Sequence, residues 1–192
     1  RHRDTPAWER PFLVWEGEDR RAQRSLSYRD FDAEVCRLAG ALQVLGVQRG
    51  DRVGLYMPNL PETFIAFFAA MKIGAVVMPL FSGFGPQPIV SRLNDGEAKV
   101  VLTVDGTWRR GTPGAMKSVL DEALLSVPSV QHVLVLRHLG DALPACPMTA
   151  GRDHDWAAAV ARQPAELATA ALNPGFVSWL RGAVATAFEK GL

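Results

Sequence analysis

Residues 51–80, DRVGLYMPNLPETFIAFFAAMKIGAVVMPL, decide the fold class, because the hydrophobic pattern changes its period twice within them. Residues 51–57 form a short apolar run that ends at a proline, which predicts a strand. Residues 61–73 begin with Pro-Glu and continue as an apolar helix that Gly74 closes. Residues 75–80 are apolar throughout, as in strands of parallel sheets that helices cover on both faces. The stretch therefore predicts one β-α-β unit.

The chain before this unit predicts a hairpin and a helix. Residues 11–16 are typical of a strand, and residues 24–26 are its expected hairpin partner. Ser27 is expected to cap a helix, with Asp30 in the position of a capping box. Gly46 is expected to end that helix in the left-handed conformation. The apolar side chains that recur every three or four residues along it are Tyr28, Phe31, Val35, Leu38, Leu42 and Leu45.

The chain after this unit continues the alternation of helix and strand. The pattern predicts helix 86–97, strand 99–104, helix 116–127 and strand 132–137. The order β-α-β-α-β-α-β predicts an α/β fold with a mostly parallel sheet, helices on both faces and right-handed crossovers. Beyond Gly140 the pattern loosens into a loop over 141–152. Asp153 or Asp155 is then expected to cap a short helix through Ala161.

Composition and charge argue against some classes of partner. Lys and Arg number 21 and Asp and Glu 20, so the formal net charge of +1 gives no support for a general nucleic-acid or membrane-surface binder. The longest apolar candidate, residues 64–71, stops at Lys72, far short of the roughly 20 residues needed to cross a bilayer. Cys36 and Cys146 form no disulfide framework or metal spacing, which predicts free thiols. We therefore expect a soluble, cytoplasmic protein.

Four segments carry a resemblance to a known family: GVQRGDRV at 46–53, YMPNLPE at 56–62, AAMKIGAV at 69–76 and RLNDGEAKV at 92–100. In this order, and followed by Asp105-Gly106 and Arg109-Arg110-Gly111, they resemble the acyl-adenylate-forming (AMP-binding) family, most closely its acetyl-CoA-synthetase-like branch. The resemblance covers residues 11–138. It implies that the chain is a fragment, an incomplete amino-terminal subdomain of the AMP-dependent synthetase fold.

The activity that this resemblance implies is that of a ligase with two steps. Such enzymes join a carboxylate to ATP with release of pyrophosphate, and then transfer the acyl group from the adenylate to the thiol of coenzyme A. Magnesium and a lysine normally neutralise the ATP phosphates in the first step. The resemblance thus implies coenzyme A, ATP and Mg²⁺ as cofactors of a parent acyl-CoA synthetase, with a small carboxylic acid as its substrate.

Residues 173–192 depart from the family pattern. At this place the family has a strand followed by a Thr/Ser/Gly-rich loop ending in Pro-Lys-Gly, whose backbone N–H groups close on the ATP phosphates. Here SWLRGAVATAFEKGL occupies 178–192, with Ala, Val and Phe where glycine and hydroxyl side chains are required. We therefore expect a partial family domain over 1–172 and a divergent tail over 173–192 that replaces the phosphate-binding loop. Catalysis by this piece alone is not expected, which leaves its status as an enzyme open.

The segment LFSGFGP at 80–86 follows an apolar strand and precedes a helix, at the edge of the sheet where ligands tend to bind. In the family the matching loop, commonly Phe-Gly-Gly-Phe, lies against coenzyme A. The resemblance implies that Ser82, Gly83 and Phe84 contact coenzyme A, with Ser82 in place of a glycine. The alternative is an ordinary βα turn that needs glycine for its backbone angles.

Two arginines follow the strand predicted at 99–104. A guanidinium is a good bidentate partner for a phosphate, and the family arginine that matches Arg109 approaches the 3′-phosphate of coenzyme A. The resemblance implies this role for Arg109, although Thr112 stands where a second arginine is often found. The alternative is that both arginines are solvated surface charges, and this is the expectation for Arg110. Trp108 either stacks on an adenine or is a partly buried packing residue.

Other polar residues are expected to have structural roles. None of the four histidines has a cysteine or carboxylate at ligand spacing, so no metal site is predicted. The adjacent residues Asp153, His154 and Asp155 point in different directions, so helix capping is expected rather than catalysis. Two alternatives to the ligase fragment remain. One is a non-catalytic coenzyme A-binding or subunit-interaction module, and the other is a chain that folds poorly and self-associates through an apolar sheet edge.

Overall fold

A parallel sheet of five strands forms the centre of the computed structural model. The structure describes residues 3, 5–18, 22–143 and 145–170. In chain order the strands are β3 (Arg52–Tyr56), β4 (Val76–Leu80), β5 (Val100–Val104), β8 (His132–Leu136) and β9 (Asp153–Asp155). Their order across the sheet is β4-β3-β5-β8-β9, and every neighbouring pair is parallel. The predicted α/β class is therefore confirmed.

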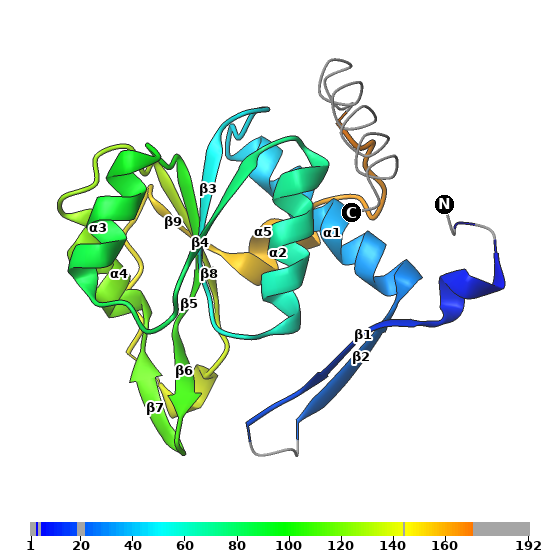
Figure 1. The fold of residues 1–192 in the computed structure, drawn as a ribbon, viewed down its shortest axis with the longest axis horizontal. Coiled ribbons are helices and arrows are strands. Elements are labelled where there is room, and N and C mark those ends of the chain that lie inside the picture. The colour runs from blue at the N-terminus through cyan, green and yellow to red at the C-terminus, as the bar shows by residue number, and fades with distance from the viewer. Residues whose placement is uncertain (1–2, 4, 19–21, 144, 171–192) are drawn as a thin grey trace, which may run out of the picture.

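Helices cover both faces of this sheet, as Figure 1 shows. α1 (Tyr28–Val44), α2 (Pro61–Lys72) and α5 (Trp156–Ala161) lie on one face, and α3 (Pro86–Asp95) and α4 (Lys117–Leu124) lie on the other. Short 3-10 helices cover Pro6–Glu9 and Gly140–Ala142. Two antiparallel hairpins complete the fold: β1–β2 (Pro11–Glu16 and Gln23–Ser27) and β6–β7 (Gly106–Arg109 and Thr112–Ala115). Both hairpins extend at the lower end of the view in Figure 1, where the parallel strands have their carboxyl ends.

The hydrophobic core lies between the central strands and the two helix layers. All five residues of β5 are buried, because helices cover that strand on both sides. Leu38 and Leu42 of α1 are fully buried on one face of the sheet. Ile89 and Leu93 of α3 are fully buried on the other face. The continuous apolar runs of the sequence thus correspond to the middle of the sheet.

Strand β4 is not covered on both faces, although its apolar sequence predicts that it would be. It lies at one edge of the sheet, where only Leu80 of its residues is buried and Val76 is 49% exposed. Pro79 has no backbone N–H to donate, which suits an edge position. Within the part of the chain that the structure describes, no strand pairs with the outer side of β4. An apolar run alone therefore does not distinguish a central strand from this edge strand.

The ends of α1 follow the predicted local chemistry. The side chain of Ser27 accepts the N–H of Asp30, and the Asp30 carboxylate accepts the N–H of Ser27, which completes the capping box. Gly46 has a φ of 77°, and the N–H of Val47 donates to the carbonyl oxygen of Leu42 at 3.0 Å. This is the Schellman arrangement, so the predicted left-handed glycine is confirmed.

Two elements differ from the expectation. The three-residue strand β9 pairs with β8, and only Asp155 acts as a cap, accepting the N–H of Ala158 at the start of α5. The side chain of Asp153 is instead fully buried and pairs with Lys117 at 2.8 Å. The β6–β7 hairpin occupies a stretch expected to be a loop. Its two strands contain glycine and proline, which weaken the sequence signal for a strand.

Both cysteines have the state that was expected. Cys36 is buried, Cys146 is partly buried, and both are free thiols. The longest helix of the described chain is α1, with 17 residues. Among the described residues, no helix combines the length and the apolar character that crossing a membrane would require.

Candidate functional site

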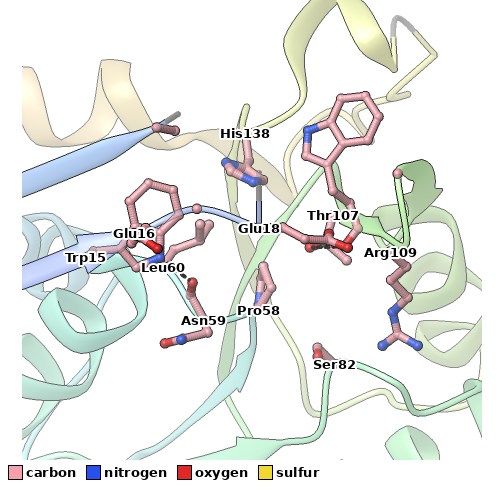
Figure 2. Close-up of a pocket in the computed structure, with 14 residues that line it drawn as sticks. Trp15, Glu16, Glu18, Pro58, Asn59, Leu60, Ser82, Thr107, Arg109 and His138 are labelled. Atoms are coloured by element: carbon pink, nitrogen blue, oxygen red, sulfur yellow. Dashed lines mark hydrogen bonds between the residues drawn. The ribbon is translucent and has the colours of Figure 1, made fainter. Parts of the chain in front are cut away.

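A pocket of about 950 Å³ opens at the carboxyl edge of the parallel sheet, between the two hairpins (Figure 2). The segments that follow β3, β4 and β8 contribute Asn59, Ser82 and His138 to its wall. Trp15 comes from the β1–β2 hairpin and Arg109 from the β6–β7 hairpin. Ligands of open α/β sheets bind in the crevice outside the carboxyl ends of the strands. This pocket is therefore the main candidate site.

The loop after β4, residues 81–85, is held to the neighbouring strand. The hydroxyl of Tyr56, at the end of β3, donates a hydrogen bond of 3.0 Å to the carbonyl oxygen of Phe84. Within the loop, the N–H of Phe84 donates to the carbonyl oxygen of Phe81 at 2.9 Å. Burial raises the pKa of the Tyr56 hydroxyl, and the positive charge of Arg109 partly opposes this effect. Tyr56 thus stays a neutral donor that fixes the shape of the loop.

Arg109 lies directly against this loop. A Cβ atom placed on Gly83 would be 3.1 Å from Nη2 of Arg109 and 2.5 Å from Cε1 of Phe81. Only glycine leaves room for the guanidinium beside the loop backbone without moving Phe81. The structure therefore brings together two segments that the sequence separates by 26 positions, and both contribute to the pocket wall.

The four predicted contact residues do not all face the pocket. Ser82 and Arg109 line it, and Gly83 lies beside Arg109. Phe84 is absent from the lining, because its ring packs against the hydrophobic core with the guanidinium of Arg92 5.3 Å from its centre. Gly83 and Phe84 thus shape the loop, whereas Ser82 and Arg109 contribute polar groups to the pocket wall.

Two further residues of the pocket were not predicted from the sequence. The indole N–H of Trp15 donates to the carbonyl oxygen of Asn59 at 2.8 Å, which fixes the ring at the pocket wall. His138 lines the pocket after β8, and burial lowers its pKa, partly offset by the carboxylates of Asp105 and Glu62. Trp108 also lines the pocket and is 43% exposed, so part of its surface is accessible from the pocket. Trp15 and His138 come from segments far from Trp108, so no local sequence signal predicts that the three residues share one pocket.

Asp105 fixes the two segments that carry Arg109 and His138. Its fully buried carboxylate accepts backbone N–H groups from Gly106, His138, Leu139 and Gly140 at 2.8 to 3.0 Å. A buried polar group without hydrogen-bond partners is costly, and these bonds satisfy the carboxylate oxygens of Asp105. These bonds join the end of β5 to the end of β8. They thereby fix the spacing between the segment that carries Arg109 and the segment that carries His138. The sequence drew attention to Asp105 only as part of a resemblance, and this role was not predicted.

No metal centre accompanies the pocket in the described part of the chain. His132 and His154 come within 3.0 Å of each other through their ring nitrogens, but no group of three or more His, Cys, Asp or Glu residues could hold a metal ion there. The chemistry available in the pocket consists of a guanidinium, hydroxyl groups, backbone amides and indole rings. These groups suit an anionic ligand that also has a flat ring.

These features define an α/β protein with a pocket at the carboxyl edge of its sheet, lined by a guanidinium, hydroxyl groups and indole rings. The chain belongs to the AMP-binding enzyme family, whose model matches residues 1–172. The resemblance seen in the sequence is therefore confirmed at the level of the family.

Individual relatives agree with this assignment. The acetyl-coenzyme A synthetase of Rhodopirellula baltica is 40% identical over 96% of this chain, and that of Syntrophus aciditrophicus is 42% identical over 75% of it. Among solved structures, the acetoacetyl-CoA synthetase from Streptomyces lividans matches this chain with a TM-score of 0.74 and 25% sequence identity. The match covers 84% of this chain and 24% of that structure's chain. This chain spans only 28% of the length of the Rhodopirellula baltica protein and 22% of the length of the Syntrophus aciditrophicus protein.

Proposed function

We propose that the pocket binds coenzyme A, with a phosphate group placed between Arg109 and the loop of Ser82 and Gly83. The observation that carries this proposal is the approach of Nη2 of Arg109 to within 3.1 Å of the Cβ position of Gly83. A guanidinium held beside a bare stretch of backbone can form charge-assisted hydrogen bonds to a phosphate. Among the described residues, no carboxylate forms an ion pair with Arg109, so its donors are available to a ligand.

The neighbouring residues fit the other parts of this ligand. The hydroxyl of Ser82 faces the same pocket and can donate to a phosphate oxygen. The exposed ring of Trp108 offers a surface on which adenine could stack. Thr112 lies opposite Arg109 in the β6–β7 hairpin and supplies one hydroxyl in place of a second guanidinium. We therefore expect binding that is weaker than in a site with two arginines.

We further propose that the parent protein is an AMP-forming acyl-CoA ligase. Membership of the AMP-binding enzyme family and the acetyl-coenzyme A synthetase relatives support this proposal. Such a ligase would use a small carboxylic acid, ATP and Mg²⁺. Coenzyme A would supply the thiol that accepts the acyl group. The residues of this chain would bind and orient that cofactor through its phosphate and adenine groups.

A polypeptide of these 192 residues is proposed to bind coenzyme A without forming an acyl-adenylate. The family model matches residues 1–172, and this supports placing the division of the chain at 173. Residues 173–192 lie outside the described part of the chain, and their sequence lacks the Thr/Ser/Gly-rich loop. A cradle of backbone N–H groups for a triphosphate requires such small residues.

Titration calorimetry of coenzyme A into the 192-residue chain tests the binding proposal. Arg109→Ala should weaken binding by about tenfold or more, because hydrogen bonds to charged groups contribute about 1.5–3 kcal/mol each. Arg110→Ala is the matched control, since it removes an equal charge from the same hairpin. It should change the affinity by less than about twofold if the effect is specific. Equal losses in both variants, or no binding by the wild-type chain, would contradict the proposal.

An assay of pyrophosphate release tests the proposal that the 192-residue chain forms no acyl-adenylate. With ATP, Mg²⁺ and acetate, the 192-residue chain should release no pyrophosphate above the buffer rate. Release of pyrophosphate that a substitution within residues 1–192 abolishes would show that the chain itself adenylates. In that case the proposed division between binding and adenylation would be wrong.

A second candidate function is a non-catalytic module that contacts another subunit. The observation that favours it is the outer edge of β4, with which no described strand pairs and where Val76 is 49% exposed. Such an edge can pair with a strand of another chain. The two candidates differ in the surface they use, so self-association that does not respond to coenzyme A would support the second.

A further inference from the structure

The two hairpins that flank the pocket are joined by one carboxylate. Glu18, which follows β1, accepts a hydrogen bond of 2.8 Å from the backbone N–H of Arg110. Arg110 and Gly111 form the two-residue loop between β6 and β7, and their φ angles are 51° and 76°. Two successive positive φ angles are the pattern of a type I′ hairpin turn. We call Arg109, Arg110 and Gly111 the arginine turn.

Glu18 carries a negative charge into the pocket at the place where the arginine turn offers positive charge (Figure 2). The N–H of Arg110 that donates to Glu18 could equally donate to a phosphate oxygen, because both acceptors are anionic. A carboxylate at this point also lowers the positive potential of the two guanidinium groups. Glu18 is exposed to solvent, so neither burial nor packing of its side chain holds it there.

We infer that Glu18 competes with the phosphate of the ligand for the arginine turn and thereby lowers the affinity of the pocket for coenzyme A. The inference rests on the proposed function of the pocket. Binding of a phosphate requires Glu18 to leave the N–H of Arg110 or to accept a like charge beside it. Because interactions between exposed charges are weak, removing the charge of Glu18 should tighten binding by about two- to fivefold.

The chain supplies a matched control for this charge. Glu16 lies on β1 of the same hairpin and lines the same pocket. Its carboxylate accepts a hydrogen bond of 3.2 Å from the side-chain amide of Gln23, the residue that pairs with it in β2. Glu16→Gln therefore removes an equal charge from the same wall without touching the arginine turn.

Titration calorimetry with coenzyme A on the full 192-residue chain tests the inference. Glu18→Gln keeps an oxygen that can accept the N–H of Arg110, so it removes the charge and preserves the contact. We expect Glu18→Gln to bind about two- to fivefold tighter than the wild-type chain, and Glu16→Gln to bind as the wild-type chain does. Circular dichroism and the unfolding midpoint should be the same for all three proteins.

The outcomes separate this inference from the proposal beneath it. If the wild-type chain binds coenzyme A and Glu18→Gln binds no more tightly, the inferred competition is wrong but the proposed coenzyme A site is not. An equal gain in affinity in Glu16→Gln has the same meaning. Weaker binding by Glu18→Gln overturns it too, and shows that Glu18 supports the bound state. An absence of binding in every variant overturns both claims together.

Discussion

The hydroxyl of Tyr56 is hydrogen-bonded to the carbonyl oxygen of Phe84 at 3.0 Å, across 28 positions of the sequence. This bond joins the end of β3 to the loop that follows β4. It holds Gly83 next to Arg109, and this approach is the basis of the proposed coenzyme A site. The position of the loop therefore depends on a residue that does not line the pocket.

Tyr56→Phe should loosen this loop while leaving the core intact. The ring of Tyr56 is buried and its shape is kept, so only the hydrogen bond is lost. We expect the free energy of unfolding to fall by about 0.5–1.5 kcal/mol, measured by urea denaturation. Coenzyme A binding should weaken as well, but by less than in Arg109→Ala. Unchanged stability together with unchanged binding would show that the loop keeps its shape without this bond.

Asp153→Asn should destabilise the fold far from the pocket. The side chain of Asp153 is fully buried and pairs with Lys117 at 2.8 Å and with Arg152 at 2.6 Å. Both cations also pair with Asp121. Removing the charge of Asp153 leaves the buried Lys117 with Asp121 as its carboxylate partner, so we expect a loss of about 3 kcal/mol, the lower end of the range for breaking a buried pair. Urea denaturation measures this loss. As a control, Glu9→Gln breaks the exposed ion pair of Glu9 with Arg29 and should leave the unfolding midpoint unchanged.

The stability of the chain should fall in mild acid because of His132. Burial, His154 and Lys99 lower the pKa of His132 from its ordinary value of 6.5, in that order of importance. The unfolded chain therefore binds a proton more readily than the folded chain as the pH falls below about 6.5. The contribution of His132 is fully present above that pH and is lost as the pH falls through its lower folded-state pKa.

The matching experiment compares the wild-type chain with His132→Gln by urea denaturation between about pH 7.5 and about pH 5.5. Glutamine can still form a hydrogen bond to His154, but it does not titrate. The variant should lose less stability than the wild-type chain over this interval. Part of the fall should persist in the variant, because burial also lowers the pKa of His138. Parallel curves for the two proteins would contradict the assignment to His132.

Val76→Lys should reduce self-association of the chain. Val76 lies on the edge strand β4 and is 49% exposed, so a lysine there opposes edge-to-edge pairing. Size-exclusion chromatography with light scattering should show a concentration-dependent mass for the wild-type chain and a smaller dependence for Val76→Lys. Val14→Lys is the matched control, because Val14 is 75% exposed on a different sheet and should have no effect. An equal effect of both substitutions would argue against the edge of β4.

The order of strands and helices was predictable because each central element has its own period. Residues such as Leu38 and Leu42 repeat at helical spacing, and β5 is apolar throughout, so local pattern and final environment agree. The edge position of β4 was not predictable, because its apolar side chains resemble those of a covered strand. Burial at an edge depends on which strands lie beside it, and the local sequence does not contain this information.

The pocket could be predicted only in part. Ser82 and Arg109 were found through short segments that resemble a family, and both line the pocket. Trp15 and His138 meet there because Asp105 joins the ends of β5 and β8 and because the first hairpin folds over Asn59. These contacts connect residues that are 33 or more positions apart, so no window of sequence contains them.

A crystal structure of the 192-residue chain grown with coenzyme A tests the central claim most directly, by measuring the distances from the ligand phosphates to Arg109. We predict one phosphate within hydrogen-bonding distance of the Arg109 guanidinium and beside the backbone of Gly83, with Glu18 displaced from the N–H of Arg110. Ordered coenzyme A bound elsewhere, with no phosphate near Arg109, would contradict the account.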